Sequence, residues 1–237
     1  MKLYEVYQKI NTVLMEGGNV FPGQTAPFDH ELVAGMVDEL NKILDPIDGV
    51  NALPIGSGAN PTPGKKMGDL DIIIDAQAVM NYFGAPDIKT AKQQLEQLFA
   101  KKYDTARTGQ SVHVKLYPQG SKTGAQVDIM VIPDAEKVAK FHTHQIPLNS
   151  EYKGKHKQIA MSNLAKNRGY KWSAFKGLIE PNTNQAITDL DEIAKILLGT
   201  SATANNLSSL ETILQALPKP QAVDLMKDLK NDKQFTK

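Results

Sequence analysis

The 237-residue sequence contains no cysteine, only one tryptophan, and no apolar run of the roughly 18–20 residues that a transmembrane helix needs. Without cysteine the chain cannot form disulfides, cysteine-ligated zinc sites or a thiol nucleophile. The first residues, Met1–Tyr7, do not have the basic-then-apolar layout of a secretion signal. These absences predict a cytoplasmic protein with no membrane partner.

A strong excess of charge of either sign is also missing. The chain has 27 Lys and Arg against 26 Asp and Glu, a net charge of +1, whereas general nucleic-acid binders are usually strongly basic. The sequence has no phosphate-binding P-loop, no Gly-x-Gly-x-x-Gly turn and no Gly-x-Ser-x-Gly nucleophile elbow. P-loop nucleotide hydrolases, Rossmann enzymes and serine hydrolases of the elbow type are therefore disfavoured.

Two aspartates one residue apart are the most informative feature present. Asp69 and Asp71 open a run, Gly68–Asp75, that has the apolar content of a buried strand. Residues two apart share a face of a strand, so both carboxylates point the same way from a rigid backbone. A third acid, Asp128, lies within the strand-like run 125–132 and is costly to bury unless paired or metal-bound. Three acids on neighbouring strands predict a site for hard divalent cations, with two Mg²⁺ ions as the expected set.

The order of the expected strands and helices predicts α/β or α+β packing, with helices covering one face of a sheet. We expect a first domain over residues 1–140 and a mostly helical second domain over 141–237. The expected helices span residues 2–16, 30–45, 76–83, 87–101, 152–167, 189–198, 206–217 and 219–231. The expected strands span 50–55, the Asp69 run, 102–107, 111–117 and 125–133, and residues 168–178 are expected to form a β-hairpin with Trp172 and Phe175 in its core.

The order of these motifs resembles the nucleotidyltransferase superfamily that includes DNA polymerase beta. A Gly-Ser turn, an Asp-x-Asp strand and a later third Asp read here as Gly56-Ser57, Asp69-Leu70-Asp71 and Asp128. The resemblance implies an α+β fold with a polymerase-beta-like palm, a mixed sheet with helices on one face, followed by a mostly helical part. It also implies Mg²⁺-dependent transfer of a nucleoside monophosphate, ribo or deoxyribo, from a nucleoside triphosphate to a hydroxyl. Two Mg²⁺ ions, which Mn²⁺ could replace, would be held by the three acids, with Asp128 nearest the attacking hydroxyl.

The same resemblance implies a site for the triphosphate. Gly56, Ser57 and Gly58 would hold the β and γ phosphates, since glycines let the backbone approach an anion and present N–H groups to it. Lys65 and Lys66, in the following linker, could swing onto the triphosphate, and two solvated loop lysines are the alternative.

Basic residues gather between 150 and 180, where aromatic residues are interleaved with them. Lys153, Lys155, Lys157, Arg168 and Lys171 are the residues that we expect to contact nucleic acid. A solvated helix face is the alternative interpretation. The helix, Gly-containing turn and hairpin of this region also resemble the thumb of family X DNA polymerases, which favours a nucleic-acid 3′ end as the acceptor.

The sequence departs from the family in ways that leave the acceptor open. Gln126 stands two residues before the third Asp, where the family usually has a basic residue, and no helix-hairpin-helix pattern precedes residue 50. Transfer of the nucleotide to a protein or small molecule is therefore the second hypothesis. A non-catalytic structural or interaction protein on the same scaffold is the third. The choice between ribo- and deoxyribonucleotides, the base preference, template dependence and oligomeric state stay open.

Overall fold

The chain forms two compact units in the computed structural model, and each is described by itself. Met1–Pro54 and Pro61–Ala135 make up the first unit, and Ile55–Asn60 and Glu136–Lys237 the second. The structure describes residues 20–60, 64, 66–109, 111–142, 150–231 and 235. The helix predicted over residues 2–16 and the predicted site residue Lys65 lie outside these ranges.

A five-stranded mixed sheet forms the centre of the first unit. Its strand order is β2 (Leu53–Pro54), β4 (Asp69–Asp75), β7 (Ala125–Ile132), β6 (Ser111–Leu116) and β5 (Asp104–Thr108). β4 and β7 run parallel, and every other neighbouring pair is antiparallel. The strand predicted over 50–55 is reduced to two residues at this edge, where Pro54 has no N–H for a ladder.

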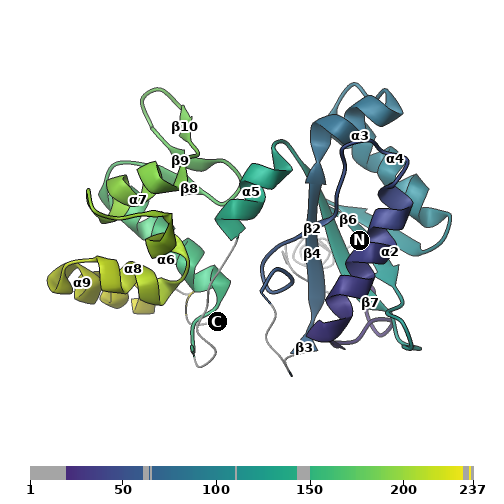
Figure 1. The fold of residues 1–237 in the computed structure, drawn as a ribbon, viewed down its shortest axis with the longest axis horizontal. Coiled ribbons are helices and arrows are strands. Elements are labelled where there is room, and N and C mark those ends of the chain that lie inside the picture. Colours follow the sequence, from purple (N-terminus) through teal and green to yellow (C-terminus); the bar gives the residue numbers. More distant parts are fainter. Residues whose placement is uncertain are drawn as a thin grey trace, which may run out of the picture. The chain divides into compact units, whose positions relative to one another are not determined.

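Three α-helices of the first unit lie on one face of this sheet (Figure 1). They are α2 (Val33–Leu44), preceded by the 3₁₀ turn η1 (His30–Leu32), α3 (Ala76–Phe83) and α4 (Ile88–Ala100). Asp75 and Asp87 cap α3 and α4 by accepting hydrogen bonds from Ala78 N and Thr90 N. A short ribbon of β1 (Phe28–Asp29) and β3 (Lys66–Met67) completes the unit. The predicted α+β class, with helices on one face, is the observed one.

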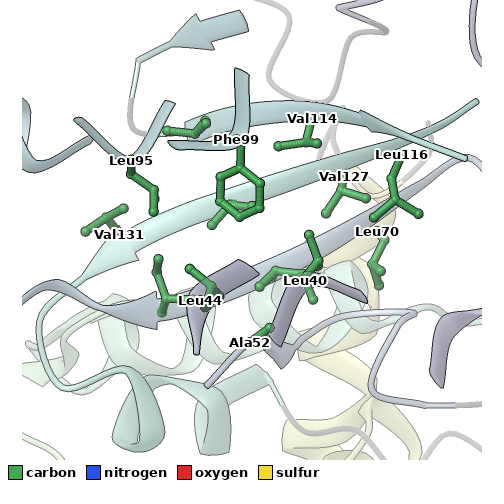
Figure 2. Close-up of a cluster of buried hydrophobic side chains, with 14 of the residues drawn as sticks. Leu40, Leu44, Ala52, Leu70, Leu95, Phe99, Val114, Leu116, Val127 and Val131 are labelled. Atoms are coloured by element: carbon green, nitrogen blue, oxygen red, sulfur yellow. The ribbon is translucent and has the colours of Figure 1, made fainter. Parts of the chain in front are cut away.

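Apolar side chains from the helices meet alternate residues of the strands in a single core. Phe99 of α4 lies at the middle of this cluster, surrounded by Leu40, Leu95, Val114 and Val127 (Figure 2). Phe99, Leu95 and Leu40 are completely buried. Close packing against the helices thus determines which residues of each strand face the helices, and the alternate residues lie on the opposite face of the sheet.

The second unit is mostly helical and has its own core. Its helices are α5 (Ala135–His142), α6 (Gly154–Asn167), α7 (Leu190–Leu198), α8 (Leu210–Ala216) and α9 (Lys219–Asn231), with the 3₁₀ turn η2 (Ala204–Leu207) before α8. A three-stranded sheet of β8 (Lys171–Ser173), β9 (Gly177–Ile179) and β10 (Ala186–Ile187) extends the predicted hairpin by one strand (Figure 1). Gly177 has a positive φ, and a Cβ there would clash with the Ile187 carbonyl oxygen of β10.

Trp172 lies in this second core, as expected, with its ring edge-to-face on Phe141 at a centroid distance of 5.5 Å. Its indole Nε1 donates to Gln158 Oε1 at 2.7 Å. Phe175, also expected in the hairpin core, is instead 44% exposed, because it lies in the turn between β8 and β9.

The division between the units differs from the predicted boundary of 140/141. It falls at Ala135/Glu136, because Phe141 of α5 is buried in the second core, and Ile55–Asn60 is grouped with the second unit. Of the helices that the structure describes, none is both long and apolar enough to cross a membrane.

Candidate active site

The face of the central sheet opposite the helices carries polar side chains from three adjacent strands. Along β4, Leu70, Ile72 and Ile74 belong to the core beneath the helices, so Asp69 and Asp71 project from the opposite face. Asp71 is directly paired in register with Asp128 of the parallel strand β7. The three predicted acids therefore lie on one face of two neighbouring strands.

The surroundings of the Asp69 and Asp71 carboxylates disfavour their ionised forms. Burial raises the pKa of Asp71 to about 7, with further contributions from the negative charges of Asp69 and Asp128. Burial also raises the pKa of Asp69, and Asp128 adds to the shift. Lys115, a cation on the same face, is engaged in an ion pair with Asp104 and a hydrogen bond to Gln24 Oε1. The acids thus repel one another in a partly desolvated environment.

Asp128 is the most enclosed of the three acids and has two side-chain hydrogen bonds. It is 7% exposed, and its Oδ1 lies 2.8 Å from His113 Nδ1 and 3.0 Å from Gln126 Nε2. His113 is the directly opposite residue on β6 and is itself 5% exposed. Sequence reasoning missed His113. A histidine alternating with Val112 and Val114 in a predicted strand was the available signal.

Asp75, at the end of the same strand as Asp69 and Asp71, has a different role. Its carboxylate accepts the Ala78 N–H at 3.0 Å and begins helix α3. The run Gly68–Asp75 therefore contains two acids in the site and one that serves as a helix cap.

The carboxylates of Asp69, Asp71 and Asp128 have the chemistry of a divalent-cation site. Carboxylate oxygens are the ligands that Mg²⁺ and Mn²⁺ prefer, and mutually repelling acids are relieved by a bound cation. In the described parts of the chain, no three Asp, Glu or His side chains converge closely enough to enclose an ion. The donor type and charge fit a divalent cation at Asp69, Asp71 and Asp128, and binding requires their side chains to turn toward a common point.

The predicted phosphate loop belongs to the second unit. Gly56 has φ +57°, a left-handed conformation that favours glycine, and Ser57 is exposed. The Gly58 N–H donates to Ile55 O at 3.0 Å and so closes the turn, while Asn60 Nδ2 donates to Gly56 O at 2.8 Å. Gly58 is thus used to shape the loop. Lys66, in the first unit, is exposed on β3 opposite Asp29.

The predicted nucleic-acid residues are divided by helix α6. Lys153 and Lys155 are exposed at its N-terminal end, and Arg168 and Lys171 are exposed at or beyond its C-terminal end. A 14-residue helix is about 21 Å long, so these residues form two basic spots and not one patch.

Lys157 departs from the other four predicted cations. It is 3% exposed, its Nζ donates to the Phe141 carbonyl oxygen at 3.2 Å, and burial lowers its pKa to about 8. The spacing of Lys157 with Ala160, Met161 and Leu164 puts it on the buried side of the helix. This position does not suit the predicted contact with a nucleic-acid backbone.

Fold and site together define an α+β protein with a carboxylate-bearing face on a mixed sheet. Comparison with known protein families finds no match, and no curated protein matches the chain. The structure is similar to that of Leishmania infantum polymerase beta in a ternary P/T complex, with 15% identity, TM-score 0.47 and coverage of 91% of this chain and 84% of that one. The ternary gap complex of the same protein matches at 18% identity and TM-score 0.46, covering 93% of this chain and 72% of that one.

Proposed function

We propose that this chain is a divalent-cation-dependent nucleotidyltransferase. It would transfer a nucleoside monophosphate, ribo or deoxyribo, from a nucleoside triphosphate to a hydroxyl and release pyrophosphate. The observation that carries the proposal is the register of β4 and β7, which pairs Asp71 with Asp128 and puts Asp69 on the same face. Asp69 and Asp71, whose pKa values are raised by burial and by neighbouring carboxylates, form with Asp128 a site that favours a cation bound to polyphosphate.

The three acids are the proposed holders of the cations. When bound, divalent cations neutralise charge on the triphosphate and lower the pKa of an attacking hydroxyl. The hydroxyl oxygen of the acceptor attacks the α phosphorus, the bond from that phosphorus to the bridging oxygen breaks, and pyrophosphate leaves. Asp128 Oδ1 is engaged by His113 and Gln126, and we assign the hydroxyl proton to its other oxygen, Oδ2.

The Gly-Ser turn of the sequence supports Gly56 and Ser57 as residues that hold the triphosphate, with Gly58 closing the turn, and Lys66 is proposed from its place in the linker that follows in the sequence. Ser57 is exposed and can donate its hydroxyl to a phosphate oxygen, and Lys66 offers an exposed ammonium group. Lys65 is proposed to contact the triphosphate on the basis of the sequence alone.

A nucleic-acid 3′ end is the proposed acceptor. Lys153 and Lys155 at one end of α6, and Arg168 and Lys171 at the other, are exposed cations about 20 Å apart, a span that two phosphates several nucleotides apart on one strand can bridge. A protein or small-molecule acceptor is the second candidate. It is favoured by the net charge of +1 and by the burial of Lys157, which removes one cation from the predicted surface.

A labelling assay tests this function. The protein is incubated with each α-labelled NTP or dNTP and Mg²⁺ or Mn²⁺, together with single-stranded DNA, primer–template DNA, RNA or no nucleic acid. The Asp69→Ala/Asp71→Ala variant is the inactive control, and Asp75→Ala is the matched control for loss of an acid from the same strand. We expect label on a nucleic-acid end with wild type and Asp75→Ala, and none with the double variant.

The other outcomes separate the hypotheses. Label found only on protein or on an added small molecule identifies the second candidate. If wild type transfers no label and binds no nucleotide in a metal-dependent manner, the proposed function is wrong and the scaffold is non-catalytic.

A further inference from the structure

His113 is held between a carboxylate and a hydroxyl on the polar face of the sheet. Its Nδ1 lies 2.8 Å from Asp128 Oδ1, and its Nε2 lies 2.5 Å from Thr108 Oγ1. Strand pairing sets both contacts, because His113 is opposite Asp128 on β7 and diagonal to Thr108 on β5. The side chain is 5% exposed, so it does not exchange these partners for water.

The chemistry of the two partners determines which ring nitrogen carries the proton. An ionised carboxylate only accepts hydrogen bonds, so Nδ1 must be the donor toward Asp128. In the neutral ring Nε2 then accepts, and the Thr108 hydroxyl is the donor. Asp128 therefore sets the tautomer of His113, and the Thr108 hydroxyl, which can donate or accept, is compatible with it.

Gln126 provides a second donor to the same carboxylate oxygen. Its Nε2 lies 3.0 Å from Asp128 Oδ1, and its Oε1 accepts the Val20 N–H at 2.8 Å. The backbone N–H of Val20 can only donate, so it fixes which end of the Gln126 amide faces Asp128. Gln126 is 2% exposed, and its position is as restricted as that of His113.

We infer that His113 is a positioning residue for Asp128, acting with Gln126 to hold Oδ1 so that Oδ2 is presented to the cation and to the acceptor hydroxyl. This inference rests on the proposed function. Carboxylate ligands of metals are commonly oriented by such hydrogen bonds, and loss of one typically weakens metal affinity about 10–100-fold. His113 would then be required for the site although it does not touch the substrate.

Binding of Mn²⁺ alone, followed by electron paramagnetic resonance of the free ion, tests this inference without relying on turnover. Wild type is compared with His113→Leu, which lacks the donor, and with His113→Asn, whose Nδ2 occupies a position close to that of the imidazole Nδ1. We expect His113→Leu to bind Mn²⁺ about 10–100-fold more weakly and His113→Asn to recover most of that loss.

Asp128→Ala and Asp69→Ala/Asp71→Ala are measured beside these variants. Weakened binding in Asp128→Ala together with wild-type affinity in His113→Leu overturns the positioning role alone. Unchanged Mn²⁺ affinity in all variants, including the double variant, overturns the proposed function and the inference with it. A merely structural role for His113 predicts that His113→Asn and His113→Leu lose Mn²⁺ affinity equally.

The tautomer is measured on wild-type protein, so the inference remains testable if His113→Leu does not fold. Two-dimensional ¹⁵N–¹H spectra of the histidine rings, assigned with His113→Asn, distinguish the protonated nitrogen. We expect His113 to carry its proton on Nδ1 in wild type and to keep it there in Thr108→Val, because Asp128 still requires a donor. A proton on Nε2 in wild type contradicts the inference.

Discussion

The two faces of the central sheet show how one set of strands serves two purposes. On the helical face, Ile72, Val114 and Val127 are completely buried against α2 and α4. On the other face, the alternate residues Asp71, His113 and Asp128 are polar, although they are also largely removed from water. Burial of the first set stabilises the fold, whereas burial of the second set costs free energy unless partners or cations compensate. Because side chains alternate along each strand, one set of residues stabilises the fold and the residues between them carry the proposed chemistry.

The helical face predicts the largest effect on stability. Phe99→Ala removes a completely buried aromatic side chain from the centre of the first core and should lower the free energy of unfolding by about 3–5 kcal/mol. Hydrogen exchange of peptides from β4 and β7 would measure the loss in this unit. Fluorescence of Trp172, the only tryptophan, reports the second unit and serves as the control. Unchanged hydrogen exchange in β4 and β7 would contradict the claim that the helical face of the sheet stabilises this unit.

Removing a carboxylate from the polar face should have the opposite effect and raise the free energy of unfolding. Asp71→Asn should raise stability by about 1–3 kcal/mol at pH 8, because it removes a buried, repelled carboxylate. The pKa of Asp71 is raised to about 7 in the folded state, so the folded protein binds the extra proton between about pH 4 and pH 7. Wild-type stability therefore falls, relative to the variant, as pH rises through this window.

Thermal unfolding of wild type and Asp71→Asn at pH 4 and pH 8 measures this difference. The gain should be present at pH 8 and absent near pH 4, where the wild-type side chain is protonated in the folded state. A variant that is less stable than wild type at pH 8 would show that the carboxylate has partners that we have not assigned.

Divalent cations should supply a smaller stabilisation on the same face. Mg²⁺ at ten times its dissociation constant stabilises the folded state by about 1.4 kcal/mol, which is roughly 3–6 °C in Tm for a chain of this size. Calorimetry at pH 8, with and without EDTA, would detect the shift. Asp69→Asn/Asp71→Asn should show none, and an equal shift in that variant would locate the cation elsewhere.

The smallest effect is expected at the end of the same strand. Asp75→Ala removes the cap of α3 and should cost about 1 kcal/mol. Mn²⁺ affinity should stay at the wild-type value. A loss of affinity comparable to that of Asp69→Ala/Asp71→Ala would place Asp75 in the site and end the distinction between these acids.

The sequence was sufficient to predict much of the fold and three residues of the candidate site. Alternation in Gly68–Asp75 is enough to put Asp69 and Asp71 on one face, and the helices α3 and α4 were predicted nearly to the residue. These features are local, because they depend on side-chain periodicity and capping within one segment.

What could not be predicted depends on pairings between distant segments. The contact of His113 with Asp128 follows from the register of β6 and β7, which a single sequence does not specify. The bond from Val20 N to Gln126 likewise joins residues more than a hundred positions apart. The charge of Lys157 favours the surface, whereas its helical spacing with Ala160 and Leu164 indicates the buried side.

The parallel pairing of β4 and β7 determines at what stage of folding the molecule becomes able to bind a cation. Parallel neighbours cannot be joined by a tight turn, and here α3, α4, β5 and β6 all intervene between the strands that carry Asp71 and Asp128. Contacts between segments so far apart form late in folding, because closing the long loop must come first. Cation affinity should therefore arise with completion of the whole sheet during refolding, after the local helices have formed, and a chain stopped before β7 would lack Asp128 and with it the complete site.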